Sequence, residues 1–255
     1  MFEAGQIAIF FLVLARISAF FAAGPVFSMP NIPGLVKIGL SFTLAVIVFP
    51  SVSANTVNYA MDSWEYVFAL LREVLFGLAL GYVATLVFNA LIFAGSLIDL
   101  HIGFFMSSIF DPMSGSMAGI ISKFLHLLGL AVLLGFNGHH IIIAALVRSY
   151  QVVPVNSAKV SAASALFLIK VFAQMILIGV QIAAPLIAVM LIVDVTLGLL
   201  ARTAPQINVF MLGFPIKIIF GLLTLSVMVP VMVRIIYSLF STIEQDMLTL
   251  MRGMT

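Results

Sequence analysis

The sequence predicts an all-α membrane protein of about six long, kinked apolar helices. Of its 255 residues, 64% are hydrophobic and only 8% are charged, whereas about a quarter of a soluble domain is charged. The mean hydropathy is +1.29. The apolar runs reach or exceed the roughly 20 residues that a helix needs to cross a bilayer, and they lack the alternation of strands. These observations exclude an ordinary soluble enzyme and a disordered chain.

Seven apolar runs give the expected helices in chain order. The first has the length of one crossing, and the second is shorter and needs its flanking residues. The third, sixth and seventh exceed one crossing, so they must tilt, bend or continue outside the bilayer. The runs are 4–23, 35–50, 66–98, 118–136, 139–150, 160–201 and 207–240.

Proline and glycine predict where these runs bend or stop. Pro185, Pro215 and Pro230 lie inside the two last runs, where each removes a backbone donor and favours a kink. Clusters of Gly, Pro, Asn and Ser predict the breaks between helices. The breaks are expected at 24–34, 50–63, 101–119, 137–138, 152–158 and 203–206.

Small residues recur at a spacing of four along several runs. This spacing lets helix backbones approach closely within a membrane, where the hydrophobic effect between helices is weak. It therefore predicts helix packing faces without naming their partners. The sets are Ala15/Ala19/Ala23, Gly77/Gly81, Gly115/Gly119, Gly179/Ala183 and Ala184/Ala188.

Ionisable residues interrupt runs that otherwise read as lipid-facing. Each costs roughly 2.5–3.5 kcal/mol at the centre of a membrane helix, so this many predicts shelter by partner helices or water. Arg16, Lys37 and Arg234 are expected to extend towards the lipid headgroups. Lys170 and Asp194 lie deep in one run, where a buried pair or a wet cavity is expected.

Asp99 and Asp194 occupy similar segments, each four residues before a glycine. Two such aspartates suit an ion-coupled transporter or the proton-sharing dyad of an intramembrane protease. Other enzyme motifs are absent from the sequence, including zinc-protease, serine-hydrolase, phosphate-loop and dinucleotide patterns. With no cysteine and four scattered histidines, we predict no metal and no cofactor. A net charge of +2 gives no surface for nucleic acid.

The loop at 103–115 is aromatic and rich in methionine, although a polar loop is expected between two spans. Exposed to water it would form an adhesive patch. It therefore reads either as a buried re-entrant loop or as an apolar constriction that gates a channel by dewetting. Gly103 and Gly115 are the candidate hinges at its ends. The candidate constriction residues are Phe104, Phe105, Met106, Ile109, Phe110 and Met113.

Four sequence blocks point to one family by their order and spacing. They are Arg16 with Pro25 and Ile32–Leu40; Ala94–Asp99 with Phe110–Pro112; Phe136–His139; and Leu197–Leu200 with Arg202, Pro205–Gln206, Phe210 and Gly213–Lys217. In these blocks the chain resembles the FliR family, the flagellar type III export-gate proteins whose injectisome counterpart is SctT.

The resemblance implies a non-enzymatic subunit of the export gate in the bacterial inner membrane, at the flagellar basal body. Its implied partners are FliP-like and FliQ-like subunits, FlhB-like and FlhA-like proteins, unfolded export substrates and membrane lipid. The family further implies a FliP-like half at 1–158 and a FliQ-like helical hairpin at 159–255. The 103–115 loop would be the plug, with Met106, Ile109 and Phe110 facing the channel.

Three function classes follow, in this order: the export-gate subunit, an ion-coupled transporter using Asp99 and Asp194, and an intramembrane aspartyl protease. Under the first, intrahelical charges are expected to be buried or to contact neighbouring subunits, with Arg202 and Lys217 pairing with neighbours or capping their helix ends. The full set is Arg72, Glu73, Asp99, Lys170, Asp194, Arg202, Gln206 and Lys217.

Overall fold

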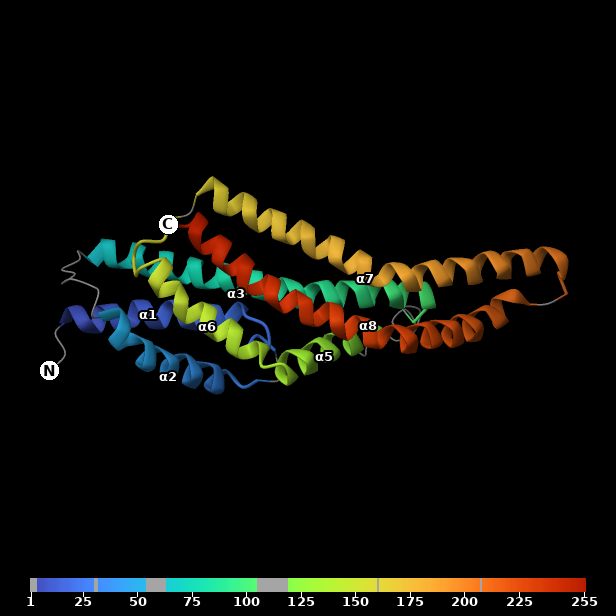
Figure 1. Ribbon diagram of the computed structural model, residues 1–255, viewed down its shortest axis with the longest axis horizontal. Helices are drawn as coiled ribbons and strands as arrows, with labels where there is room; N and C mark the ends of the chain where they lie inside the picture. Colours follow the sequence, from blue (N-terminus) through green and yellow to red (C-terminus); the bar gives the residue numbers. More distant parts are fainter. Residues whose placement is uncertain (1–3, 30–31, 54–62, 105–118, 160, 207) are drawn as a thin grey trace. The chain divides into compact units, whose positions relative to one another are not determined.

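The computed structural model describes most of the chain as seven α-helices (Figure 1). The described residues are 4–29, 32–53, 63–104, 119–159, 161–206 and 208–255. Within them there is no strand, so the all-α prediction is confirmed. The helices are α1 (Ala4–Ala23), α2 (Gly34–Ser53), α3 (Ser63–Ile102), α5 (Ile120–Gly135), α6 (Gly138–Val152), α7 (Ala162–Thr203) and α8 (Val209–Gly253).

The helices follow the predicted runs, and their ends lie within a few residues of the predicted ends. The exception is α8, which continues to Gly253 beyond the apolar run that ends at residue 240. α7 continues through Pro185, and α8 continues through Pro215 and Pro230. Five helices are long and apolar enough to cross a membrane, and α5 with α6 would make a sixth, broken span. The prediction of about six long apolar helices is confirmed.

Two compact units divide the chain, and α3, α7 and α8 each contribute to both. The first unit contains residues 1–87, 137–172 and 240–255, and the second contains 88–136 and 173–239. The first therefore holds α1, α2 and α6, and the second holds α5 and most of the α7–α8 hairpin.

In the first unit, α1 and α3 pack through the small residues that the sequence singles out. A Cβ added at Gly77 would lie 2.3 Å from the carbonyl oxygen of Arg16 and 3.0 Å from the Cβ of Ala19. One added at Gly81 would lie 2.9 Å from the Cβ of Ala23. Side chains at either glycine would force the helices apart, so the predicted packing face is confirmed.

α2 joins this unit through aromatic contacts with α1. The ring of Phe10 meets those of Phe42 and Phe49 edge to face, with centroids 5.7 Å apart in both pairs. The opposite face of α2 is apolar and exposed, with Leu35 82% accessible. A helix with this pattern packs on one side and presents the other to lipid or to another protein.

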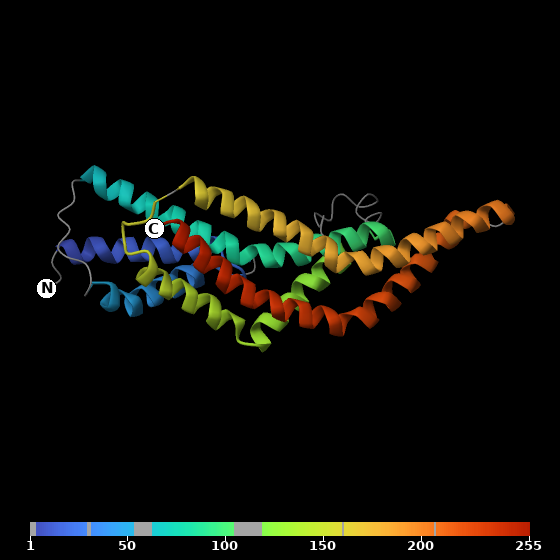
Figure 2. The ribbon, with the colours of Figure 1, turned by 45° about the horizontal axis from the view of Figure 1, so that its top comes forward.

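In the second unit, α7 and α8 form an antiparallel hairpin that both views show (Figures 1 and 2). Close approaches join this hairpin to the end of α3. A Cβ at Gly179 on α7 would lie 3.1 Å from the carbonyl oxygen of Ala90, and one at Gly221 on α8 would lie 2.6 Å from the side chain of Ile102. The hairpin thus sits beside the helix end from which the 103–115 loop departs.

Candidate functional site

Of the candidate plug loop, the structure describes only the first two residues, Gly103 and Phe104. The remaining predicted plug and hinge residues lie outside the described residues, and their roles stay predictions. They are Phe105, Met106, Ile109, Phe110, Met113 and Gly115. What the structure does describe is how the chain leaves α3 and how it enters α5.

Gly103 ends α3 in a conformation that favours glycine. Its φ is +100°, a left-handed value that L side chains rarely adopt. Its N–H donates to the carbonyl oxygen of Asp99 at 3.0 Å. A Cβ at this position would also lie 3.0 Å from the ring of Phe214 on α8. Backbone and surroundings both restrict residue 103 to glycine.

Asp99 reaches from the last turn of α3 to the first turn of α5. Its carboxylate is buried, 1% exposed, and accepts two backbone hydrogen bonds. The N–H of Ile121 donates to Oδ1 at 3.0 Å, and the N–H of Ser122 donates to Oδ2 at 2.9 Å. First-turn N–H groups have no partner inside their own helix. Asp99 therefore caps α5 from another helix, and its charge matches the positive helix end.

Two glycines and two serines bring α3 and α5 into contact around this carboxylate. A Cβ at Gly119 would lie 1.9 Å from Oδ2 of Asp99, and one at Gly95 would lie 2.3 Å from the Cα of Ser122. The hydroxyls of Ser96 and Ser122 are 3.2 Å apart. We call Gly95, Ser96, Asp99, Gly119, Ile121 and Ser122 the Asp99 clasp.

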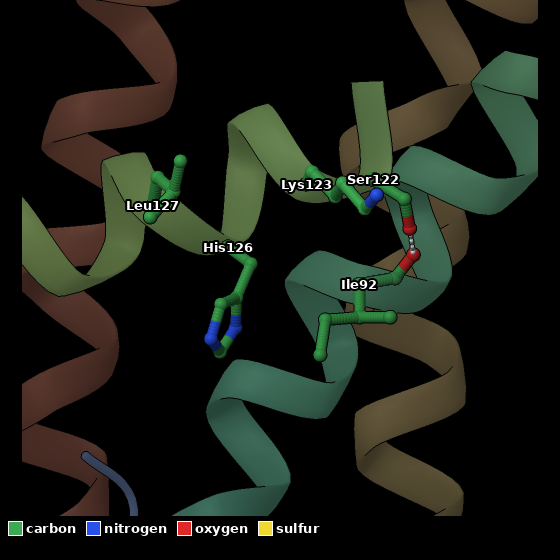
Figure 3. Close-up of a pocket in the computed structure, with 5 residues that line it drawn as sticks. All are labelled: Ile92, Ser122, Lys123, His126 and Leu127. Atoms are coloured by element: carbon green, nitrogen blue, oxygen red, sulfur yellow. Dashed lines mark hydrogen bonds between the residues drawn. The ribbon is translucent and has the colours of Figure 1, made fainter. Parts of the chain in front are cut away.

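A pocket of about 290 Å³ lies next to the clasp, between α3 and α5 (Figure 3). The hydroxyl of Ser122 donates across it to the carbonyl oxygen of Ile92 at 2.7 Å. Lys123 is exposed, and Nδ1 of His126 is buried without a hydrogen-bond partner in the described part of the chain. Leu127 completes the lining. No group of three His, Asp or Glu among the described residues is placed to hold a metal ion.

An ion pair joins the two arms of the hairpin. Nζ of Lys217 on α8 lies 2.5 Å from Oδ1 of Asp194 on α7, and both side chains are partly exposed. Leu197 and Phe214 line the apolar pocket around the pair, which has a volume of about 350 Å³. Asp194 is therefore paired with a residue of the same chain, but the pair is partly exposed and not buried as expected.

Arg16 corrects one prediction from the sequence. It does not extend towards headgroups: it is 0% exposed and its guanidinium binds the Glu73 carboxylate through two hydrogen bonds of 2.5 and 3.0 Å. Nη1 also donates to the carbonyl oxygen of Val153 at 3.0 Å and to the hydroxyl of Ser149 at 3.3 Å. The prediction was wrong because it treated each charge alone, although opposite charges interrupt both apolar runs.

Aromatic rings complete the surroundings of this ion pair. The guanidinium of Arg16 lies 4.6 Å from the ring centre of Phe76 and 4.3 Å from that of Tyr150, both within cation–π range. The backbone N–H of Asn156 donates to Glu73 Oε1 at 2.8 Å. The pair thus connects α1, α3, α6 and the loop after α6 at a fully buried point.

The other predicted charge positions lie at the surface of the chain. Arg234 is exposed, and Nζ of Lys37 donates to the carbonyl oxygen of Met29 at 3.2 Å. The extension of Lys37 and Arg234 towards lipid headgroups stays a prediction, as do the contacts of the assembly set with neighbouring subunits. The exposed members of the predicted assembly set are Arg72, Lys170, Arg202 and Gln206.

The two aspartates of the alternative hypotheses have separate partners. The carboxylate of Asp99 accepts two backbone N–H groups, and that of Asp194 binds Lys217. A protease dyad requires two carboxylates that share one proton. This arrangement does not favour such a dyad.

Comparison with known proteins gives one consistent result. The profile of the family described as bacterial export proteins, family 1, matches residues 7–243. The flagellar biosynthetic protein FliR of Bacillus subtilis (strain 168) is 36% identical over 239 residues, 92% of each chain. FliR of Escherichia coli (strain K12) is 30% identical over 235 residues, 92% of this chain and 89% of the relative. FliR of Aquifex aeolicus (strain VF5) is 34% identical over 217 residues, 84% and 83% of the two chains.

Proposed function

The chain belongs to the FliR family of bacterial export proteins, and from this premise we propose that it is a structural subunit of the flagellar type III export gate. In this role it helps to form the pore for unfolded export substrates and performs no enzymatic step. Its proposed location is the bacterial inner membrane, at the flagellar basal body. The extent of the match supports the proposal, since it covers nearly the whole chain.

The observation that carries a role in a larger complex is the length of α7 and α8. They contain 42 and 45 residues, so each is more than 60 Å long at about 1.5 Å per residue. The hydrocarbon core of a bilayer is only about 30 Å thick. Apolar side chains nevertheless continue along both helices, and only 17% of the most apolar part of α8 is buried within the chain. Apolar surface beyond the hydrocarbon core requires cover by protein.

The proposed cover is provided by FliP-like and FliQ-like subunits, with FlhB-like and FlhA-like proteins completing the apparatus. Within the chain, residues 1–158 would take the place of a FliP-like subunit and 159–255 that of a FliQ-like hairpin. The exposed apolar faces of α2 and α8 support this assignment, because each is long enough for a helix of another subunit to pack against it.

The loop at 103–115 is proposed to seal the pore at rest. Its apolar residues would exclude water and ions, while the unbranched, flexible side chains of Met106 and Met113 would yield to an extended substrate. Gly103 and Gly115 would supply the hinges. The described departure from α3 and entry into α5 support the proposal, because both are held by specific contacts.

Co-expression with the FliP-like and FliQ-like subunits tests the assembly, with native mass spectrometry as the measurement. A stable hetero-oligomer is the expected result. A chain that remains a monomer in detergent in the presence of both partners would refute it.

Loop replacement tests the plug. We expect that exchanging residues 105–114 for ten Gly and Ser residues raises ion leak across the inner membrane, because the length is kept but the apolar barrier is lost. Conductance is measured in vesicles that contain the assembled gate. Unchanged conductance with normal assembly would contradict the sealing role and leave the family assignment intact.

A further inference from the structure

We propose that Asp99 is the positioning residue for the plug loop, holding the end of α3 and the start of α5 together through its side-chain carboxylate. The consequence for ion sealing rests on the proposed function. The clasp itself rests only on described contacts in one compact unit.

Asp99 binds both ends of the loop. Its carbonyl oxygen accepts the N–H of Gly103, which ends α3, and its carboxylate accepts the N–H groups of Ile121 and Ser122, which begin α5. The first of these bonds is the i to i−4 bond of the last turn of α3, so the carboxylate alone connects that turn to the first turn of α5. The two ends of the loop are held at a set separation whatever conformation the loop itself adopts.

The chemistry of the clasp requires a carboxylate. Both oxygens of Asp99 accept, and both donors are backbone N–H groups at a positive helix end. An asparagine of the same shape has one oxygen and one NH₂ group. The NH₂ would face an N–H donor, so Asp99→Asn keeps the volume of the side chain and loses one of the two hydrogen bonds.

Gly119 is restricted to glycine by Asp99 and not by its own backbone. Its φ and ψ are −62° and 166°, an extended conformation that alanine adopts freely. The obstacle to a Cβ is the Asp99 side chain, with Oδ2 at 1.9 Å, Cγ at 2.2 Å and Cβ at 2.8 Å. Asp99→Ala removes the Oδ2 and Cγ atoms but keeps the Cβ at 2.8 Å, so the destabilisation by Gly119→Ala should become smaller without disappearing.

Gly95 provides the matched contrast. A Cβ there would meet backbone atoms of Ser122, with the Cα at 2.3 Å and the nitrogen at 2.7 Å. Shortening the Asp99 side chain leaves this obstacle in place. Gly95→Ala should be equally harmful with Asp99 or with alanine at position 99, whereas Gly119→Ala should not.

The first experiment measures hydrogen exchange of residues 119–125 in the full chain, purified in the assembled gate. Loss of a buried charged cap should speed exchange roughly five- to tenfold in Asp99→Asn and Asp99→Ala. Gly119→Ala should do the same in the native background and add less to Asp99→Ala, in which only the Cβ of residue 99, at 2.8 Å, still opposes the new Cβ. Gly135→Ala is the control, because a Cβ there meets nothing within 4 Å. Unchanged exchange in Asp99→Ala, or additive effects of the two substitutions, would overturn the clasp.

The second experiment restores the clasp chemically. The Ser96 and Ser122 hydroxyls are 3.2 Å apart, and the chain has no cysteine, so Ser96→Cys/Ser122→Cys introduces a unique pair. In the Asp99→Ala background, vesicles should leak ions when the pair is reduced and seal severalfold better when it is oxidised. Comparing one preparation in two redox states removes differences in folding and expression.

The outcomes separate the inference from the proposed function. If loop replacement raises leak and Asp99→Ala does not, the loop seals the pore but Asp99 does not position it, and the inference falls. If Asp99→Ala speeds exchange but oxidation of the cysteine pair leaves the leak unchanged, the inference falls as well. If loop replacement itself leaves conductance unchanged, the sealing role falls, and the exchange data alone decide whether the clasp exists.

Discussion

At the scale of single residues, the chain neutralises its buried charges mainly within itself. Arg16 and Glu73 are fully buried and share two hydrogen bonds, while further groups satisfy the rest of the guanidinium. Taking two charges out of water is tolerable only with such complete pairing. An unpaired arginine at the same place would cost far more than the pair does. This explains why an apolar helix carries Arg16 at all.

Arg16→Met should therefore destabilise the chain by about 3–5 kcal/mol, because it leaves the Glu73 carboxylate buried and unpaired. Arg16→Met/Glu73→Gln should cost less than the sum of the two single substitutions, since it removes both charges. Thermal unfolding in detergent measures the effect. Arg72→Ala is the control, because Arg72 is the exposed neighbour of Glu73. Equal losses in Arg72→Ala and Arg16→Met would contradict this account.

Lys217 presents a different case, because its ion pair with Asp194 is partly exposed. Exposed pairs contribute about 0–1 kcal/mol, so Lys217→Ala should change the stability of the isolated chain little. If partner subunits cover the pair in the gate, the same substitution leaves Asp194 unpaired in an apolar setting and should weaken the complex. Comparing melting of the isolated chain with dissociation of the complex checks this. Equal, small effects in both would argue against a role in assembly.

At the scale of helices, glycine spacing decides which pairs approach closely. The carbonyl oxygens of α1 lie directly against Gly77 and Gly81 of α3, so the two backbones touch with no side chain between them. Such contact provides dispersion attraction between the helices. This matters in a membrane, because lipid is as apolar as the side chains and the hydrophobic effect does not drive helices together there. The same residues leave room on α1 for Arg16 to reach Glu73 on α3.

Gly77→Ala should destabilise the first unit by about 1–3 kcal/mol, because its Cβ would lie 2.3 Å from the backbone of α1 and the helices must separate. Gly39→Ala on α2 should be neutral or slightly stabilising, since nothing lies within 4 Å of its Cβ and alanine favours helix. Thermal unfolding of both variants in detergent provides the comparison. A Gly77→Ala chain as stable as Gly39→Ala would disprove the close contact.

At the scale of the whole molecule, α7 and α8 each carry more apolar surface than a single crossing of the bilayer can cover. α7 and α8 are each more than twice the length that a membrane requires. The sequence anticipates this excess, because the runs at 160–201 and 207–240 are already too long for one span. Fold class and helix positions are predictable because they depend on local composition and on Gly and Pro punctuation.

The candidate site is less predictable, because its contacts join residues far apart in the chain. The sequence marks Asp99 as an intramembrane charge in a segment similar to that of Asp194, but nothing near it in sequence indicates that its partners are the N–H groups of residues 121 and 122. The sequence shows Gly119 only as one member of a pair of small residues four apart. The structure shows why glycine is needed there: a Cβ would collide with the Asp99 carboxylate. Composition and the family resemblance predict the plug residues, and most of them lie outside the described residues.

The sequence by itself determined that this is an all-helical membrane protein of the FliR family, with breaks near the predicted positions. Those properties follow from short-range chemistry: hydropathy, helix length, and residues that stop a helix. Only the tertiary structure decided that Arg16 pairs with Glu73 and that Lys217 pairs with Asp194. It also decided that the Asp99 carboxylate accepts hydrogen bonds from the first turn of α5. A buried charge must find a partner, but the choice of partner depends on which helices lie side by side.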